Sequence, residues 1–189
     1  MTFRDRLTTR KGEIGERIME RILRERGYEV FRPSDLANGH RIDGIAIKRN
    51  NPKQAIICDA KAKPARVNHA DTGIDLEHWR GYKALAEAHN MRAILFFVDE
   101  DEGTVRANFL DVLDQRHWHK SSKTGRLVRP AYPLVENTVD DEIRYYELVD
   151  LPIRARLEPQ EIAELRGLST RDSKYQAIAE KRLQEARLL

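Results

Sequence analysis

The sequence predicts an α/β fold, because helical and strand-like hydrophobic patterns alternate along the chain. Apolar residues recur at helical spacing in residues 11–27 and again in residues 76–90. Residues 41–61 instead have the pattern of two short strands joined by a polar turn. The continuous apolar run at residues 93–98 is typical of a strand in the centre of a sheet, covered on both faces. Helices packed against a central sheet are therefore expected.

Composition limits the class of protein. The chain has 189 residues, 40% of them hydrophobic, which is enough for one core with an appendage. Its single cysteine, Cys58, excludes an internal disulfide and a cysteine-rich zinc site. The longest apolar run is too short to span a membrane and the N-terminus lacks an apolar signal region, so we expect a cytoplasmic protein without a membrane partner. The net charge of +3 permits a polyanionic partner without requiring one.

The first predicted helix spans residues 11–27. Its apolar face consists of Ile14, Ile18, Ile22 and Leu23. Gly27 stands in the usual position after a helix end, and Thr8 or Thr9 can cap the start. Glu16 lies off the apolar stripe, so it faces either a cleft or, by default, solvent.

A strand at residues 28–31 precedes a predicted antiparallel hairpin. Residues 41–48 form the first hairpin strand, and Asp43 lies inside that strand pattern, followed by a glycine. An aspartate before a glycine is more often a turn cap than a ligand, but apolar residues flank this pair on both sides. A polar turn leads into residues 55–61, so the hairpin can bring Asp43 near Asp59.

The second hairpin strand ends in charged residues. Side chains alternate across a strand, so Asp59 and Lys61 share the face of the apolar Ile57. A carboxylate and an ammonium group on a hydrophobic strand are costly to bury unless they pair or bind an ion. A salt bridge between the two is the simpler interpretation of this motif alone, and an ion-binding site is the alternative.

The chain beyond the hairpin alternates polar segments with regular elements. Residues 66–75 are expected to form a polar loop, and residues 76–90 a second helix. The acidic stretch at residues 99–103 is expected to be an exposed turn rather than a metal site. Residues 105–112 fit either an edge strand or a short helix.

Residues 116–129, which we call the basic segment, contain no acidic residue. The segment contains one tryptophan, Trp118, among the basic residues Arg116, Lys120, Lys123, Arg126 and Arg129. A phosphate backbone and an unstacked base would select such a composition, so we interpret the segment as a DNA contact. A solvated loop with a buried tryptophan explains the composition equally well.

The last part of the chain is expected to divide into a strand and helices. Residues 143–149 are the final strand candidate of a main domain at residues 1–150. Residues 151–189 are predicted to form a helical extension with amphipathic helices at 159–168 and 173–189.

Short motifs stand in a fixed order along about residues 11–98. They are Lys11-Gly12-x-x-x-Glu16-Arg17, Arg41-Ile-Asp43-Gly-Ile-Ala, Ile57-Cys-Asp59-Ala-Lys61 and His78-x-x-x-Tyr82. In this order and spacing they resemble the PD-(D/E)xK nuclease superfamily, and the early motifs look most like the archaeal Holliday junction resolvases. The last motif is similar to the Gln-x-x-x-Tyr motif of RecB-type nucleases, with His78 in place of Gln.

The resemblance implies a restriction-endonuclease-like fold, a mixed β-sheet flanked by helices, and Mg²⁺-dependent hydrolysis of DNA phosphodiester bonds, with Mn²⁺ able to substitute. Asp43, Asp59 and the Ala60 backbone carbonyl would bind the ion. Glu16 would bind through a water or a second ion, and Lys61 would orient or deprotonate the attacking water. Together with the basic segment, the residues expected to contact DNA are Lys11, Arg17, Arg66, His78, Tyr82, Trp118, Lys120, Lys123 and Arg126.

Alternatives from two other classes remain open. The first is a catalytically inactive DNA-binding module of the same fold, which is disfavoured because every residue of the implied catalytic set is present. The second is an assembly subunit that acts through its helical tail at residues 159–189, and it predicts a stable oligomer and no Mg²⁺ dependence. A homodimer, and endonuclease or exonuclease action on junctions, ends or flaps, all remain compatible with the sequence.

Overall fold

The computed structural model describes residues 7–32, 42–65, 71–116, 119–120, 127–128, 143–148 and 151–168, together with residues 181 and 184. The helices in these ranges are α1 (Leu7–Glu25), α2 (Leu76–Ala88), α3 (Leu110–Arg116) and α4 (Pro159–Gly167). The strands are β1 (Tyr28–Phe31), β2 (Gly44–Lys48), β3 (Asn51–Ala62), β4 (Asp71–Asp75), β5 (Arg92–Asp99), β6 (Thr104–Phe109), β7 (His119–Lys120), β8 (Leu127–Val128), β9 (Ile143–Glu147) and β10 (Ile153–Arg156).

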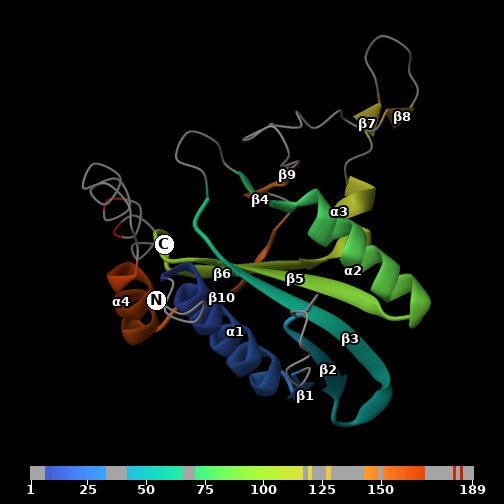
Figure 1. The fold of residues 1–189 in the computed structure, drawn as a ribbon, viewed down its shortest axis with the longest axis horizontal. Helices are drawn as coiled ribbons and strands as arrows, with labels where there is room; N and C mark the ends of the chain where they lie inside the picture. Colours follow the sequence, from blue (N-terminus) through green and yellow to red (C-terminus); the bar gives the residue numbers. More distant parts are fainter. Residues whose placement is uncertain are drawn as a thin grey trace.

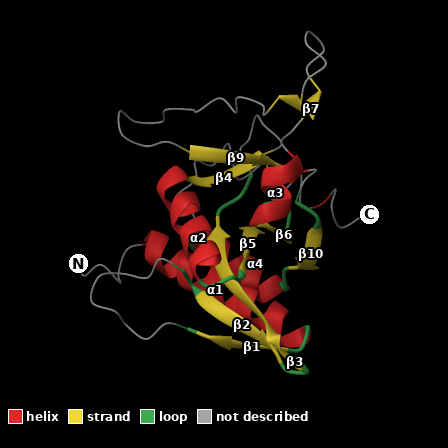
Figure 2. Ribbon diagram, turned by 90° about the vertical axis from the view of Figure 1, so that its right-hand side faces the viewer, coloured by secondary structure: helices red, strands yellow, loops and turns green. Residues whose placement is uncertain are grey.

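A six-stranded sheet organises the described part of the chain, with the strand order β1-β2-β3-β5-β6-β10 (Figure 1). The β3–β5 pair is parallel and the other neighbouring pairs are antiparallel. Strands β4 and β9 form a separate two-stranded ribbon, which lies beside the start of α2 in both Figure 1 and Figure 2. The predicted α/β class is confirmed, as a mixed sheet flanked by helices.

Strand β5 lies inside this sheet and is covered on both faces, as its continuous apolar sequence predicted. Alternate residues enter two different hydrophobic clusters. Ile94, Phe96 and Val98 pack with α1 and α4, and Ala93, Leu95 and Phe97 pack with Tyr82 of α2 and with α3. The same alternation on β3 sends Cys58 to the α1 side and Ile57 to the α2 side. The residue after Ile57 on its face is Asp59, so the predicted site faces α2.

Several predicted elements are confirmed and others are corrected. The strand at residues 28–31 and the helix starting near residue 76 are present, and Gly27 ends the first helix with a φ of +76°. Helix α1 begins at Leu7, so Thr8 and Thr9 lie within its first turn and do not precede it as caps. The expected loop before α2 is wrong for residues 71–75, which form β4.

Residues 105–112 contain both of the elements that the pattern allowed. Strand β6 occupies the first part and α3 begins at Leu110. Strand β6 is not an edge strand, because β5 lies on one side of it and β10 on the other. Residue 109 is the last residue of β6, so the strand and helix follow each other without a loop.

The acidic turn between β5 and β6 was expected to be exposed, and this expectation is wrong. Asp99, Glu100 and Asp101 are exposed by only 4%, 1% and 6%. The Asp99 carboxylate accepts hydrogen bonds from the backbone N–H groups of Ala65 at 2.9 Å and Asp101 at 2.9 Å, so donors replace the water it loses. Lys11 of α1 forms an ion pair with Glu100. Burial is the main reason that the pKa of Asp99 is raised to about 6.

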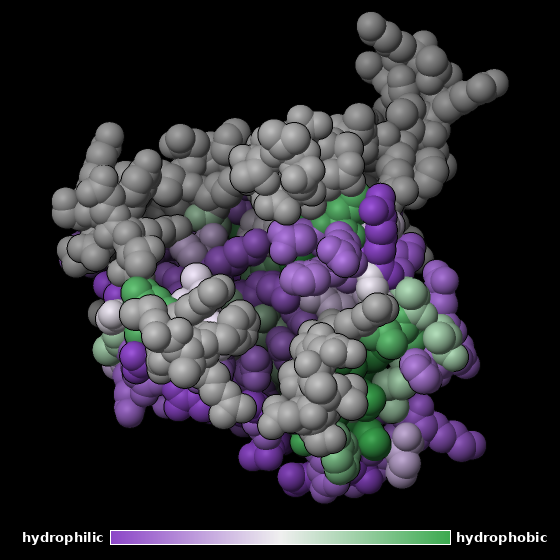
Figure 3. Space-filling view, viewed as in Figure 1, coloured by the Kyte–Doolittle hydropathy of each residue, from purple (hydrophilic) through white to green (hydrophobic). Residues whose placement is uncertain are grey.

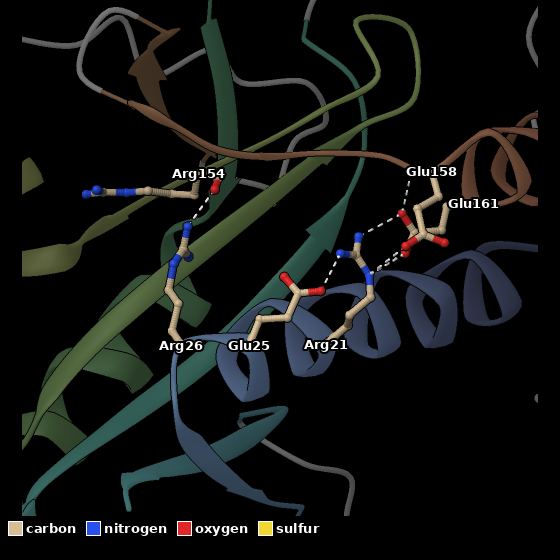
Figure 4. Close-up of polar contacts among 6 residues, drawn as sticks. All are labelled: Arg21, Glu25, Arg26, Arg154, Glu158 and Glu161. Carbon is tan, nitrogen blue, oxygen red and sulfur yellow. Dashed lines mark hydrogen bonds and ion pairs between the residues drawn. The ribbon is translucent and has the colours of Figure 1, made fainter. Parts of the chain in front are cut away.

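Residues 151–168 join the main sheet and do not extend away from it. Strand β10, which the sequence did not predict, pairs with β6. Helix α4 begins at Pro159 as expected, and it packs against α1. The guanidinium group of Arg21 lies 2.9 Å from Glu161, and Arg26 donates a hydrogen bond of 2.5 Å to the carbonyl of Arg154 (Figure 4). Of the predicted helix at 173–189, only residues 181 and 184 are described, and both are helical.

The described surface in Figure 3 is predominantly hydrophilic, and hydrophobic residues occur in smaller patches. Many of the charges on α1 are matched by charges on neighbouring elements. Arg17 lies 2.6 Å from Glu164 of α4, for example, and both side chains are exposed. None of the helices within the described ranges combines the length and the apolar character needed to cross a membrane.

Candidate active site

The hairpin of β2 and β3 brings two aspartates together. The register pairs Gly44 with Cys58, so Asp43 stands opposite Asp59 one step beyond the last strand pair. Asp43 precedes β2 and does not lie inside the strand as predicted. At this point the backbone hydrogen bonds between β2 and β3 end, and the Asp43 side chain takes over as acceptor. Its Oδ2 accepts a 2.6 Å hydrogen bond from the Ala60 N–H.

Asp59 is almost completely buried, with 3% exposure. The Nζ atom of Lys61 lies 2.8 Å from its Oδ1 atom, so the expected ion pair is present. The alignment is too poor for a hydrogen bond, and this oxygen has no hydrogen-bond donor among the described residues. The Lys61 ammonium also lies 5.8 Å from the centre of the Tyr82 ring. Asp59 therefore has a neighbouring cation but an incompletely satisfied buried oxygen.

Tyr82 forms the α2 side of the site. Its ring is buried, with 1% exposure, so it lies beneath the surface instead of presenting a stacking face to DNA. Its hydroxyl faces the Asp59 carboxylate without a well-aligned hydrogen bond. Burial first, and Asp59 second, raise the pKa of Tyr82 above its usual value, so the hydroxyl keeps its proton. His78, one turn earlier, is half exposed, and its Nδ1 lies 3.5 Å from Asp75.

Asp43 has the most strongly perturbed carboxyl group in the hairpin. Its pKa is raised to about 7, first because burial disfavours the charged form and second because Asp59 repels it. Glu16 adds further repulsion, whereas the Ala60 N–H and Lys61 oppose the increase. All four residues of the implied catalytic set therefore interact electrostatically at this end of the hairpin.

Glu16 reaches this region from α1, but it has another partner. Arg32, which follows β1, lies 3.1 Å from Glu16 and 2.9 Å from Glu20. The close approach of α1 to β3 depends on Gly15, because a Cβ atom there would lie only 2.9 Å from the Cβ of Ala62. The sequence analysis identified neither Gly15 nor Arg32, since only the folded chain shows which residues α1 meets.

The donor set fits a hard divalent cation. Mg²⁺ is usually held by one or two carboxylates while it keeps several waters, and Asp43 and Asp59 provide such a pair with one incompletely satisfied oxygen. The N–H and C=O of a strand residue point to the same side, so the Ala60 carbonyl is expected to face Asp43 as its N–H does. No compact group of three or more acidic, histidine or cysteine ligands occurs within the described residues, and Glu16 accordingly remains outside the pair.

The structure places the expected DNA contacts in different situations. Lys11 is paired with the buried Glu100, and Arg17 with the exposed Glu164. Lys120 belongs to β7, where only the backbone is described. The expected contacts that lie outside the described residues are Arg66, Trp118, Lys123 and Arg126.

Lys63 is a site residue that the sequence analysis missed. It is half-buried, and it follows Lys61 on the same side of the chain. Burial is the main reason that its pKa is lowered; Lys61 lowers it too, and Asp75 acts in the opposite direction. The spacing Asp59-x-Lys61-x-Lys63 was the signal in the sequence, because a strand that continued through residue 63 would put all three on one face.

Comparison of the chain with protein-family models and with curated protein sequences finds no match in either.

Proposed function

We propose that the chain is a Mg²⁺-dependent DNA nuclease with a restriction-endonuclease-like fold, acting as a structure-specific endonuclease of the kind that its motifs resemble. One observation carries the proposal. The end of the β2–β3 hairpin holds two neighbouring aspartates, the half-buried Asp43 and the buried Asp59, with the ammonium of Lys61 2.8 Å from the second. The element order and the mixed sheet are compatible with the fold that the resemblance implies.

A purely structural salt bridge accounts for only part of this arrangement. Asp59 and Lys61 neutralise each other, but Asp43 adds a second carboxylate whose proton affinity is raised by the first. Among the described residues, Lys61 pairs with Asp59 but no cation lies within ion-pair distance of Asp43, which is costly in a poorly solvated place unless a proton or cation is bound. A carboxylate left in this way indicates a site arranged for a ligand and not for stability alone.

The residues divide the chemistry of phosphodiester hydrolysis among them. A bound Mg²⁺ would neutralise charge on the phosphoryl group and polarise it. Asp43, oriented by the Ala60 N–H, and Asp59, fixed beneath the surface by burial, supply the oxygen ligands. The Lys61 side chain, with an exposure of 23%, can hold the attacking water in line with the phosphorus as an ammonium or, in its neutral amine form, take the proton of that water. Tyr82 retains its proton and excludes bulk water from the Asp59 side.

The experiment is an incubation of the protein with branched, linear and circular DNAs in Mg²⁺, Mn²⁺ or EDTA. We expect cleavage of at least one DNA with either metal and none in EDTA. Asp43→Asn should abolish cleavage. Asp114→Asn is the matched control, because Asp114 pairs with Lys83 at 3.1 Å in the α2–α3 region, away from the hairpin.

The outcomes separate the alternatives. Cleavage that persists in EDTA or in Asp43→Asn contradicts the proposed site. Tight DNA binding without cleavage in either metal supports the inactive module, and a stable oligomer that neither binds nor cuts DNA supports the assembly subunit.

A further inference from the structure

Lys63 is a cation beside the proposed catalytic residues that the chemistry described above does not use. Strand β3 ends at Ala62, and Lys63 is the next residue, two positions after Lys61. Its charge interacts with Lys61 of β3 and with Asp75, the residue that precedes α2. The side chain is half-buried.

This lysine lacks a matched anion among the described side chains. Lys61 has Asp59 at 2.8 Å, but no described carboxylate lies within ion-pair distance of Lys63. The nearest candidate, Asp75, is 56% exposed and has His78 within 3.5 Å. A half-buried cation next to a second cation is unfavourable without a counter-ion, and burial indeed lowers the pKa of this amine. The position is therefore suited to bind an anion that none of the described side chains supplies.

We propose that Lys63 binds a backbone phosphate adjacent to the one that is cleaved. The inference rests on the proposed function, since it takes the ligand to be a nucleic-acid strand. The Cα atoms of residues two apart can be separated by at most roughly 7 Å, so Lys61 and Lys63 can serve neighbouring phosphates of one nucleic-acid strand. Lys61 acts at the reacting phosphate, whereas Lys63 holds the neighbouring one equally in the ground state and the transition state. Lys63 is a positioning residue.

A structural role is the competing explanation. In that case Lys63 would attract Asp75 and hold the N-terminus of α2 against β3. Removing its charge would then destabilise the fold and would leave the affinity for DNA unchanged. The proposed role predicts the reverse, because replacing a half-buried cation without a partner by an apolar side chain does not destabilise the free protein.

The test compares Lys63→Met and Lys63→Arg with the wild type and with Lys53→Met. Lys53 is the matched control, because it is a lysine on the same strand that is exposed and lies near the other end of β3. Binding of a labelled duplex is measured by fluorescence anisotropy at several salt concentrations, with Ca²⁺ in place of Mg²⁺ and the DNA checked for integrity. The slope of log K against log salt should fall by about 0.9 in Lys63→Met, as expected when one phosphate is no longer neutralised. It should stay at the wild-type value in Lys63→Arg and Lys53→Met.

Steady-state cleavage in Mg²⁺ supplies a second readout. Lys63→Met should raise KM with kcat close to the wild type, because a contact made equally in both states affects binding alone. Its melting temperature without DNA should equal or exceed that of the wild type. Lys63→Gln takes its place if Lys63→Met does not fold.

An unchanged salt slope in Lys63→Met overturns the inference, as does an equal fall in Lys53→Met. A lower melting temperature with an unchanged slope supports the structural role. If the slope falls as expected but the wild type cuts no DNA, the nuclease proposal fails and the phosphate contact stands. If the wild type cuts DNA and the slope is unchanged, only the role of Lys63 fails.

Discussion

The raised pKa of Asp43 makes the stability of the metal-free protein depend on pH. The carboxyl has a pKa of about 7 in the folded chain, against an ordinary value of 3.8, because it is buried and faces Asp59. Well below the ordinary pKa of 3.8 it is protonated whether the chain is folded or not, so it has no effect on stability there. As the pH rises the unfolded chain loses this proton first, and the contribution of Asp43 becomes increasingly destabilising until the pH passes about 7.

The size of the effect follows from the pKa difference. Each pKa unit corresponds to about 1.4 kcal/mol, so a rise from 3.8 to about 7 makes Asp43 destabilising by about 4 kcal/mol at pH 8. Asp43→Asn removes the charge while its amide oxygen can still accept the Ala60 N–H. In EDTA at pH 8 the variant should therefore exceed the wild type in free energy of unfolding by up to about 4 kcal/mol, and at pH 5 by less than half of that.

Urea unfolding in EDTA, followed by circular dichroism at both pH values, measures these differences. Asp99, whose pKa is also raised, changes the stability of both proteins alike, so the comparison isolates Asp43. Adding Mg²⁺ should stabilise the wild type, more strongly at pH 8 than at pH 5 because the bound carboxyl must lose its proton, and should have little effect on the variant. A variant that is less stable than the wild type at pH 8 would falsify the reasoning. So would a difference between the two proteins that is the same at both pH values.

Further variants test the catalytic lysine, the packing of α1 and the basic segment. Lys61→Ala should lower the cleavage rate by about 10²–10⁴ with nearly unchanged DNA affinity, and near-normal turnover would remove Lys61 from the chemistry. Gly15→Ala should cost about 1–3 kcal/mol of stability and slow cleavage, because its Cβ would lie 2.9 Å from Ala62. Gly12→Ala, with nothing within 4 Å of its Cβ, should be neutral or stabilising by up to about 1 kcal/mol, and equal melting of the two glycine variants would contradict the close approach. Neutralising the basic segment should reduce the slope of log K for DNA binding against log salt by about 0.9 for each phosphate that the variant no longer binds. An unchanged slope would mean that the basic segment does not contact DNA. The side chains to change together are Lys120, Lys123 and Arg126.

The sequence predicted those parts of the fold that depend on nearby residues. The β2–β3 hairpin and the position of Asp43 near Asp59 follow from a short polar turn between two apolar runs, so a few residues determine the pairing. The β4–β9 ribbon was missed because Asp71 pairs with Glu147, far along the chain, and nothing near residues 71–75 indicates a partner. Strand β10 was missed for the same reason.

Burial of charge was the least predictable property. An acidic turn of consecutive carboxylates is normally exposed, and the exception at Asp99 exists because backbone N–H groups from Ala65 and Asp101 converge on it. Likewise, no pattern within α1 shows that Lys11 will meet Glu100, or that Arg32 will meet Glu16. The candidate site could be assembled from its motifs, but the partners that position it come from elements that meet only in the folded chain.

A substitution at Asp43 separates a catalytic role from a structural role more clearly than a substitution at Asp59. Replacing Asp59 would leave Lys61 without its partner in a buried place, so a loss of stability or of cleavage would have two explanations. Replacing Asp43 leaves the Asp59–Lys61 pair complete and removes only the excess charge. Replacing a carboxylate with a structural role should destabilise the protein. Replacing a carboxylate that serves as a metal ligand should instead inactivate the protein and stabilise it. Asp43→Asn should therefore show both changes in one protein, a combination that a salt-bridge role for this end of the hairpin does not produce.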